Sequence, residues 1–402
     1  MSGTQSRRRV VVTGVGIVSP LGHSAPATWQ AMLAGQQGFR PITAFDAVKF
    51  RNQQAGLVEA YPVQPMSTPG AQPRAVRFLV DAAREAFAAA GLDAGSAHGP
   101  LDMIFGTNFG GMQAAEEALM ADTGAPELQR ALTRYNFAQA GEQVQKALGV
   151  NGAVHVISLA CSSGGAAIAE GFDRIRRGRA TRMLVGGYDE LSLFCFAGLN
   201  ALRAITPDTI RPWDKGRQGT LFAEGAGCLV LEDFAAAQQR GAVVLGEVLG
   251  RGLNNDAYHM TAPEKEGKGI QACMAMALAD AGLPPAAVDH FNAHGTGTPY
   301  NDAVETKSLL AIFGERGKSI PLTANKSQLG HTMGAAGAIE AIVSLFSMKH
   351  GVVPPIIGCR EQDPDLGVTV VKDRPLSGDF AVTMSNSYGF GGTNCSLVLG
   401  RA

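Results

Sequence analysis

The stretch AVHVISLACSSGGAAIAEGFDRIRRG spans residues 153–178 and sets the pattern of the chain. Its first part, residues 153–159, is apolar and β-branched, which predicts a strand. The alanine-rich run 164–177 predicts a helix that ends at Gly178. Cys161 stands between the two, and small residues follow it. A strand that leads at once into a helix is typical of α/β proteins.

The same alternation extends through the rest of the chain and starts again near Gly241. It predicts an α/β architecture with mostly parallel, buried sheets, divided into two halves, residues 1–240 and 241–402. Further strands are expected at residues 10–13, 101–105, 183–185, 227–231, 243–248, 290–292, 322–324, 381–384 and 395–399, and further helices at 74–90, 269–281, 302–313 and 334–350.

The composition excludes several classes of protein. The net charge of −1 argues against nucleic-acid binding driven by bulk positive charge. A hydrophobic share of 46% argues against a disordered chain. Charged residues make up 17% of the chain, below the usual share of about 25%. A long chain with so few charges predicts a large core that continues across an oligomer interface.

The cysteines and the two ends of the chain predict a cytoplasmic protein. The six cysteines form no C-x-x-C pair, so neither a disulfide framework nor a zinc site is expected. Residues 7–12 imitate a signal peptide, but Thr13, Gly14 and Gly16 break the apolar run, which fits a first strand better. The uncharged stretch 380–400 is long enough to span a bilayer but too polar to face lipid.

Polar residues directly follow four of the predicted strands. They occupy residues 160–165, 292–298, 325–331 and 386–394. Ligands of open α/β sheets bind beyond the carboxyl ends of strands. We therefore expect these four segments to form a single site.

Three residues in these segments suit nucleophilic and electrophilic chemistry. Cys161 precedes a helix, whose free N–H groups and dipole would stabilise a thiolate. His294 and His331 each follow a strand, and two neutral imidazoles could donate Nε2–H groups to one carbonyl oxygen and stabilise an enolate. A metal site is a rival interpretation, but the histidines are far apart in sequence and no carboxylate cluster accompanies both. The other five cysteines are expected to be structural.

Two further features of these segments allow more than one interpretation. Lys326 could hold pyridoxal phosphate, but no phosphate-binding loop supports that. An ion pair between Lys326 and Glu340 that orients His331 is favoured, since buried charges need partners. Phe390, among the glycines of residues 389–392, is either part of a tight turn or a gate with glycine hinges.

Taken together, these motifs resemble the β-ketoacyl-acyl-carrier-protein synthases, most closely the type II enzymes. The resemblance rests on the ordered set of Cys161, His294, Lys326, His331 and the segment GFGGTN at 389–394. It covers nearly the whole chain, with further motifs at residues 10–16, 19–22, 211–214 and 224–227. It implies a thiolase-like fold of two similar halves in five αβαβα layers, and a homodimer.

The resemblance also implies a reaction. Cys161 would take an acyl chain from the phosphopantetheine thiol of an acyl carrier protein. His294 and His331 would promote decarboxylation of the malonyl group and hold the enolate oxygen, while Lys326, paired with Glu340, would support them. No other cofactor is implied, because the phosphopantetheine arrives on the carrier.

Substrate contacts are implied as well. Thr296 and Thr298 would hydrogen-bond the pantetheine arm. The backbone N–H groups of Phe390 and Cys161 would form the oxyanion hole, and the Phe390 ring would be the gate. Phe109 stands where related enzymes carry a smaller side chain, and we expect it to shorten or reshape the acyl pocket.

Carrier proteins are acidic, so a local basic patch is expected to meet them. Arg74, Arg77 and Arg203 are the candidate docking residues.

Three alternatives stay open. The chain could be a catalytically inactive or heterodimeric partner subunit similar to a chain-length factor, although such subunits lack the cysteine found at Cys161. It could be a thiolase-type acyltransferase that uses Cys395 as acid and base. The stretch 188–194 also leaves primary fatty-acid synthesis and a specialised polyketide or polyene pathway undecided.

Overall fold

The fold is built on one mixed sheet made of two similar halves. The computed structural model describes residues 8–65, 68, 70–93, 99–120, 126, 129, 133 and 135–402. In these residues, ten strands follow the order β5-β4-β6-β7-β1-β8-β14-β13-β9-β10. The halves meet where Val10–Val12 of β1 pair antiparallel with Gly246–Val248 of β8.

The two halves repeat one topology. In each half the first strand pairs antiparallel with the last, and a parallel trio of strands lies beyond them. The first half consists of β1 (Val10–Val18), α2 (Arg74–Ala89), β4 (Asp102–Gly106), α5 (Phe137–Leu148), β5 (Val154–Ile157), α6 (Ser163–Arg176), β6 (Arg182–Asp189) and β7 (Gly225–Asp233). The second half consists of β8 (Gly246–Asn255), α9 (Lys268–Ala281), β9 (His290–Asn292), α10 (Pro299–Phe313), β10 (Leu322–Thr323), α13 (Ala336–His350), β13 (Val382–Gly389) and β14 (Thr393–Gly400).

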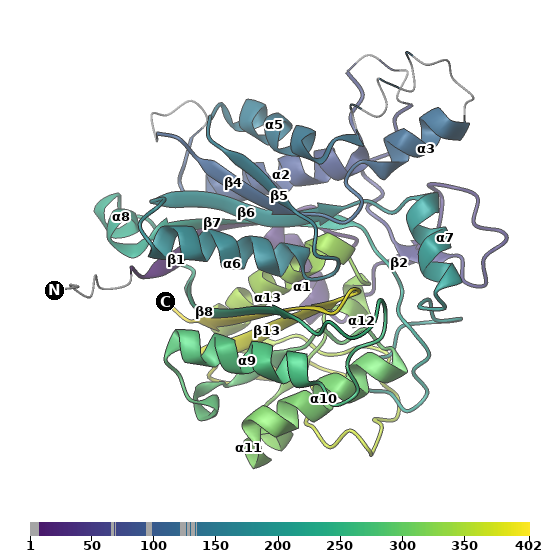
Figure 1. Cartoon of the computed structure of the whole chain (residues 1–402), viewed down its shortest axis with the longest axis vertical. Coiled ribbons are helices and arrows are strands. Elements are labelled where there is room, and N and C mark those ends of the chain that lie inside the picture. Colours follow the sequence, from purple (N-terminus) through teal and green to yellow (C-terminus); the bar gives the residue numbers. More distant parts are fainter. Residues whose placement is uncertain are drawn as a thin grey trace.

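The helices complete five layers. Figure 1 shows α2 and α5 over one outer face, α9 and α10 over the opposite outer face, and α6 and α13 between the two halves of the sheet. Apart from Glu340, the residues of α13 from Ala336 to Met348 are apolar or small, and all of them are buried. A helix that is apolar all round belongs inside a protein. The expected αβαβα arrangement of a thiolase-like fold is confirmed.

Shorter elements connect these layers. They are α1 (Ala25–Leu33), β2 (Phe39–Pro41), β3 (Gln54–Gly56), α3 (Met112–Met120), α7 (Leu193–Ala201), α8 (Phe234–Gln239), α11 (Glu315–Ser319), α12 (Lys326–Leu329), β11 (Val352–Val353), β12 (Leu376–Ser377) and the 3-10 turns η1 (Pro285–Ala287) and η2 (Met333–Ala335). Among the described residues, no helix is both long enough and apolar enough to cross a bilayer.

The expectation of mostly parallel strands is wrong. The strands β1, β6, β7, β8, β13 and β14 all take part in antiparallel pairs. The strands β13 and β14 are joined by a turn of only three residues, too short for the crossover that a parallel pair needs. The segment 386–394 therefore does not follow a strand but lies mainly within this hairpin.

The first strand is also longer than predicted, because its glycines are packing sites. β1 continues through Gly14 and Gly16 to Val18. A Cβ atom on Gly14 would lie 2.0 Å from the carbonyl oxygen of Ala86, and one on Gly16 would lie 2.1 Å from that of Ala82. These glycines let α2 approach the strand closely, as glycines do where backbones meet.

The central helices α6 and α13 also approach each other closely because glycines lie where they cross. A Cβ atom on Gly337 would lie 2.6 Å from the backbone nitrogen of Gly165. We expect Gly337→Ala to destabilise the protein by about 1–3 kcal/mol through overpacking, measured as a lower urea midpoint.

Gly198→Ala is the matched control. It lies in α7, where an added Cβ meets nothing within 4 Å, so alanine's helix propensity makes the change neutral or stabilising. Equal urea midpoints for the two variants would contradict the packing argument.

Candidate active site

A strained turn presents Cys161 between β5 and α6. Ala160 has a φ of 48°, unusual for a residue other than glycine. The hydroxyl of Ser162 lies 3.0 Å from the carbonyl oxygen of Ser387 and 2.9 Å from that of Thr393. The hydroxyl of Thr393 in turn donates to the carbonyl oxygen of Leu159 at 2.9 Å. The nucleophile turn is thus tied to the β13–β14 hairpin.

The fold brings Cys161, His294 and His331 together. Their ligand-type atoms all lie within 4.8 Å of one another. The Sγ atom of Cys161 lies 2.9 Å from Nε2 of His331. The two imidazole rings are nearly perpendicular, with centroids 5.4 Å apart. Both histidines are almost fully buried.

Hydrogen-bond donors determine which nitrogen of each ring carries the proton. Nδ1 of His294 lies 3.2 Å from the Lys326 ammonium, which can only donate. Nδ1 of His331 accepts a hydrogen bond from the backbone N–H of Met333 at 3.2 Å. Each ring must therefore accept at Nδ1 and carry its proton on Nε2, which in His331 is the nitrogen that faces the sulfur of Cys161. Burial, followed by the charge of Lys326, lowers the pKa of both histidines well below the usual value, so both rings are neutral donors.

The predicted ion pair between Lys326 and Glu340 is present, with both side chains almost fully buried. The expectation that it orients His331 is wrong, because the ammonium contacts His294 instead. His331 is held by its own backbone, which pairs with Leu221 and Ala223, and by the N–H group of Met333.

The thiol of Cys161 is less acidic than its place before a helix suggested. Burial raises its pKa to about 11. The charge of Lys326 and the backbone N–H groups of Phe390 and Cys161 lower the pKa but do not outweigh burial. The resting sulfur is therefore a thiol at neutral pH, and the thiolate expected from the helix dipole is not its resting form.

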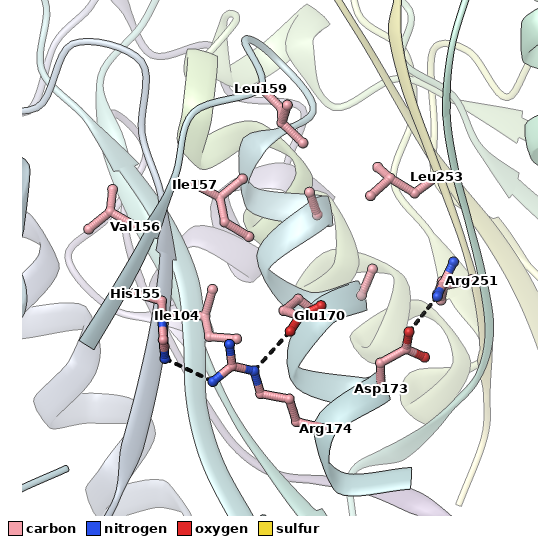
Figure 2. A pocket seen from close by; sticks show the side chains of 12 residues that line it. Ile104, His155, Val156, Ile157, Leu159, Glu170, Asp173, Arg174, Arg251 and Leu253 are labelled. Atoms are coloured by element: carbon pink, nitrogen blue, oxygen red, sulfur yellow. Dashed lines mark hydrogen bonds and ion pairs between the residues drawn. The ribbon is translucent and has the colours of Figure 1, made fainter. Parts of the chain in front are cut away.

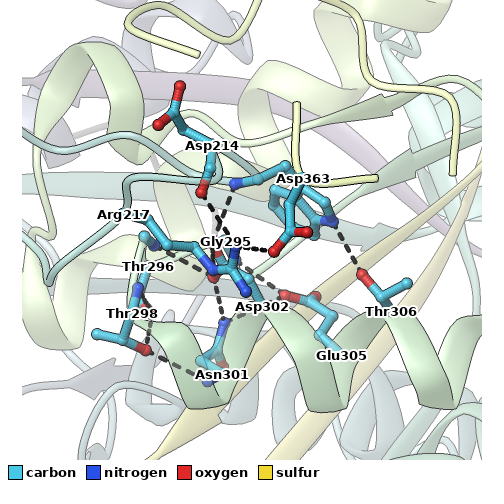
Figure 3. Close-up of polar contacts among 12 residues, drawn as sticks. Asp214, Arg217, Gly295, Thr296, Thr298, Asn301, Asp302, Glu305, Thr306 and Asp363 are labelled. Atoms are coloured by element: carbon cyan, nitrogen blue, oxygen red, sulfur yellow. Dashed lines mark hydrogen bonds and ion pairs between the residues drawn. The ribbon is translucent and has the colours of Figure 1, made fainter. Parts of the chain in front are cut away.

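Two buried carboxylates hold the loop that follows β9 (Figure 3). Glu305 accepts hydrogen bonds from the backbone N–H groups of His294 and Gly295 at 2.8 and 3.0 Å. Asp302 accepts from the N–H of Gly297 at 3.2 Å. Sequence analysis missed both acids, although their i, i+3 spacing at the start of a helix after the histidine loop was a usable signal.

The two threonines of this loop lie close together. Thr296 is buried and Thr298 is half-buried, and their hydroxyls are 2.9 Å apart. Thr298 also caps α10 by accepting a hydrogen bond from the N–H of Asn301. A cap of this kind fixes where the helix begins.

A further acid that sequence analysis missed is Asp189, at the end of β6. It accepts hydrogen bonds from the Thr107 hydroxyl at 2.7 Å, from the Phe109 N–H at 2.9 Å and from the Gly334 N–H at 2.7 Å. It therefore links the segment before α3 to the turn that carries the Met333 donor. Burial raises its pKa to about 6.

The ring of Phe109 packs against an apolar cluster that includes Cys195, Phe196 and Met333. Met333 adjoins the His331 segment, so this cluster lies beside the nucleophile. The position is compatible with a wall of an acyl pocket, and that role stays a prediction.

Phe390 lies in the three-residue turn between β13 and β14. It is 36% exposed, and Gly391 and Gly392 after it have positive φ values of 83° and 77°. The N–H group of Gly391 donates to the carbonyl oxygen of Met260 at 2.7 Å. The segment is thus a tight turn in form, with a partly exposed ring, and the backbone N–H of Phe390 reaches the sulfur of Cys161.

The three candidate docking arginines differ in exposure. The prediction that Arg74 docks the carrier is wrong, because this residue is 5% exposed and pairs with the buried Glu224. An arginine at the start of a helix can turn inward when a carboxylate inside the core needs a partner. Arg77 is half-buried and Arg203 is exposed, and both stay predictions.

A cavity of about 370 Å³ lies beside β5 and α6, outside the cluster of cysteine and histidines (Figure 2). Its lining includes Val156, Ile157 and Leu253. On one side Arg174 contacts His155 and Glu170, and on the other Arg251 pairs with Asp173. β5 pairs with β4 alone among the described strands, so its other edge is unpaired.

Comparison with known proteins gives consistent results. Residues 7–237 match the family model of the beta-ketoacyl synthase N-terminal domain, and residues 245–360 match that of the C-terminal domain. The chain is 35% identical to 3-oxoacyl-[acyl-carrier-protein] synthase 2 of Coxiella burnetii, over 98% of this chain and 99% of the relative. It is 37% identical to Nodulation protein E of Rhizobium meliloti, over 97% of this chain and 98% of the relative.

Two solved structures are similar over nearly the whole chain. The ishigamide ketosynthase/chain length factor superposes with a TM-score of 0.90 at 36% identity, covering 98% of this chain and 100% of that chain. The ketosynthase of the AntDE:AntF complex, a type II PKS acyl-carrier protein with its ketosynthase bound to the hexaketide, gives a TM-score of 0.91 at 28% identity, with the same coverage.

The raised pKa of Cys161 predicts how the free protein reacts with an alkylating reagent. Only the thiolate is a good nucleophile, so the rate of alkylation should rise about tenfold per pH unit from pH 7 to 9. Peptide mapping after iodoacetamide treatment measures this rate at Cys161. A rise of only about threefold between pH 8 and 9, as for a thiol with the ordinary pKa of about 8.5, would contradict the assignment; a short peptide with one cysteine is the reference.

Proposed function

The chain belongs to the β-ketoacyl synthase family, and we propose that it condenses an acyl chain on Cys161 with the malonyl group of an acyl carrier protein. Family membership makes it an acyltransferase. The observation that carries the proposal is the cluster itself, a thiol faced by two neutral imidazoles that both present Nε2–H. Two such donors suit a developing enolate oxygen better than they suit proton abstraction.

In the acylation step, the sulfur of Cys161 attacks the thioester carbonyl of the acyl carrier. The new S–C bond forms as the bond to the pantetheine sulfur breaks, and the proton of the thiol leaves with the pantetheine thiol. The N–H groups of Phe390 and Cys161, which reach the sulfur, would stabilise the oxyanion of this step. The ring of His331 cannot act as the base, because its proton is already on Nε2.

In the condensation step, the malonyl group loses carbon dioxide and the remaining electron pair forms an enolate. The Nε2–H groups of His294 and His331 would hold its oxygen, each donor contributing about 3 kcal/mol to the lowering of the barrier. The enolate carbon then attacks the acyl thioester, and the sulfur of Cys161 leaves as a thiolate when the carbon–carbon bond forms. The thiolate takes a proton from water, which restores the resting thiol. Lys326, with Glu340, keeps the proton of His294 on the correct nitrogen.

The substrates bring the phosphopantetheine, so the proposal needs no cofactor held by the chain itself. The hydroxyls of Thr296 and Thr298 lie on the same loop as His294 and suit hydrogen bonds to the amide groups of the pantetheine arm. The exposed Arg203 and the half-buried Arg77 are proposed to meet the acidic carrier.

We propose that a second copy, or a related subunit, covers the free edge of β5. The side chains of Val154, Val156 and Ile157 are only half-buried there. An unpaired apolar strand edge invites pairing with another chain. The thiolase-type alternative finds no support, since Cys395 is buried within β14 and lies outside the cluster of reactive groups.

Transfer of an acyl group to the protein tests the proposal directly. After incubation with acyl carrier proteins of different chain lengths, intact mass spectrometry should show an acyl adduct on the parent protein. The adduct should be absent from Cys161→Ala and retained in Cys273→Ala, which changes a buried cysteine of α9. Addition of malonyl carrier should then remove the label as product.

Absence of an adduct with every chain length would contradict the proposal. That outcome would favour an inactive partner subunit or a thioester substrate without a carrier.

Phe109→Ala tests the proposed pocket wall. Removing the ring should shift the preferred acyl group to longer chains in the same loading experiment, because space opens beside Cys195 and Met333. Phe45→Ala, which removes a ring that packs against Phe196 in the same cluster, is the control for lost packing alone. An unchanged chain-length profile for Phe109→Ala would show that the ring does not limit the chain.

A further inference from the structure

The reactive cluster has the composition of a zinc site. Thiolate sulfur and imidazole nitrogen are the ligands that Zn²⁺ prefers, and catalytic zinc sites use three protein ligands. The ligand-type atoms of Cys161, His294 and His331 lie within 4.8 Å of one another. The separation in sequence that argued against a metal site therefore has no force once the chain is folded.

The surroundings of the two rings are the reverse of those in a metal site. A histidine that binds a metal donates its other ring N–H to a carboxylate, a carbonyl or water. Here the other nitrogen of each ring accepts instead, from the ammonium of Lys326 in His294 and from the N–H of Met333 in His331. Both lone pairs that a metal would need are replaced by protons on Nε2.

Charge adds to this effect on the side of His294. The ammonium of Lys326 lies 3.2 Å from Nδ1 and its side chain is 1% exposed, so little solvent screens it from a second cation. The carboxylate of Glu305 is occupied by the backbone N–H groups of His294 and Gly295. Among the described residues no hydrogen bond joins this carboxylate to the ring of His294, whose Nδ1 contacts the ammonium instead.

One carboxylate oxygen of Glu340, the ion-pair partner of Lys326, accepts no hydrogen bond among the described residues. Oε1 of Glu340 pairs with Lys326, whereas Oε2 is buried and has no hydrogen-bond partner among the described residues. Without the lysine, this carboxylate could accept Nδ1–H of His294, directly or through a water that replaces the ammonium. That arrangement is the carboxylate–histidine pair found behind zinc ligands.

We propose that Lys326 excludes soft divalent metal ions such as Zn²⁺ from the site of the nucleophile, by holding the proton on Nε2 of His294 and by its buried charge. The sulfur and both imidazoles thus stay free for acyl substrates. This role is separate from the condensation itself and does not depend on the identity of the carrier or the acyl chain.

Titration of untagged protein with Co²⁺, a spectroscopic substitute for Zn²⁺, tests the proposal. Lys326→Met should bind one Co²⁺ per chain with a thiolate-to-cobalt charge-transfer band, about 10- to 100-fold more tightly than the parent protein. Glu340→Gln, which alters the same ion pair but keeps the ammonium, should bind no better than the parent. Lys326→Met combined with Cys161→Ser should lose the band.

The double variant Lys326→Met/Glu340→Gln removes both charges and guards against misfolding caused by an unpaired carboxylate. It should also bind Co²⁺ more tightly than the parent, since His294 is then free to change its protonated nitrogen. Tight binding with the charge-transfer band in the parent itself would overturn the proposal. Binding by both lysine variants no stronger than by the parent would overturn it as well.

Discussion

The close crossing of the two central helices is the constraint on which the site depends. A Cβ atom on Gly164 of α6 would lie 2.6 Å from the carbonyl oxygen of Gly334, just before α13, and one on Gly337 of α13 would lie 2.6 Å from the nitrogen of Gly165. Cys161 lies just before α6, and His331 lies just before the turn that leads into α13. Because the two helices meet near their N-terminal ends, the nucleophile and one imidazole are brought within 2.9 Å.

Hydrogen-bond donors, not bases, contact Nδ1 of both imidazole rings and determine which nitrogen carries the proton. Lys326 and the N–H of Met333 both point at an imidazole nitrogen and can only donate. Burial keeps both rings neutral and the thiol of Cys161 protonated. Such a site is organised to stabilise negative charge that develops on a substrate oxygen. The same protonation pattern disfavours metal ligation. One set of contacts would therefore both stabilise the substrate oxygen and keep metal ions out of the site.

Much of the fold could be predicted from local pattern. The helices α2, α6 and α9 and the strands β4 and β9 begin and end within a residue or two of the expected positions. The errors have identifiable causes. Glycines 14 and 16 were taken as the end of a strand, whereas they are contact points for α2. The strands β13 and β14 were predicted too short, at 381–384 and 395–399 with a polar segment between them, because glycine and asparagine are uncommon in strands.

Some residues of the site could also be predicted from the sequence, and others could not. Cys161, His294, Lys326 and His331 were recognisable because they stand in short motifs after strands, where the chemistry of each residue type is informative. Asp189, Asp302 and Glu305 were missed because their partners are backbone N–H groups, and only the spacing of Asp302 and Glu305 gave any signal of their role. Arg74 was misassigned for a related reason, since its exposure depends on Glu224, which lies far away in sequence.

The sequence by itself determined the order of strands and helices, the duplication of the pattern and the identity of the reactive groups, since these depend on neighbours along the chain. Only the tertiary structure decided which nitrogen of each histidine carries the proton, that Lys326 contacts His294 rather than His331, and that burial raises the pKa of the thiol. These properties depend on the direction of hydrogen-bond donors and on exclusion of water. Lys326 and His294 are 32 residues apart, and Cys161 and His331 are 170 residues apart, so both properties arise only when separate segments of the chain pack together.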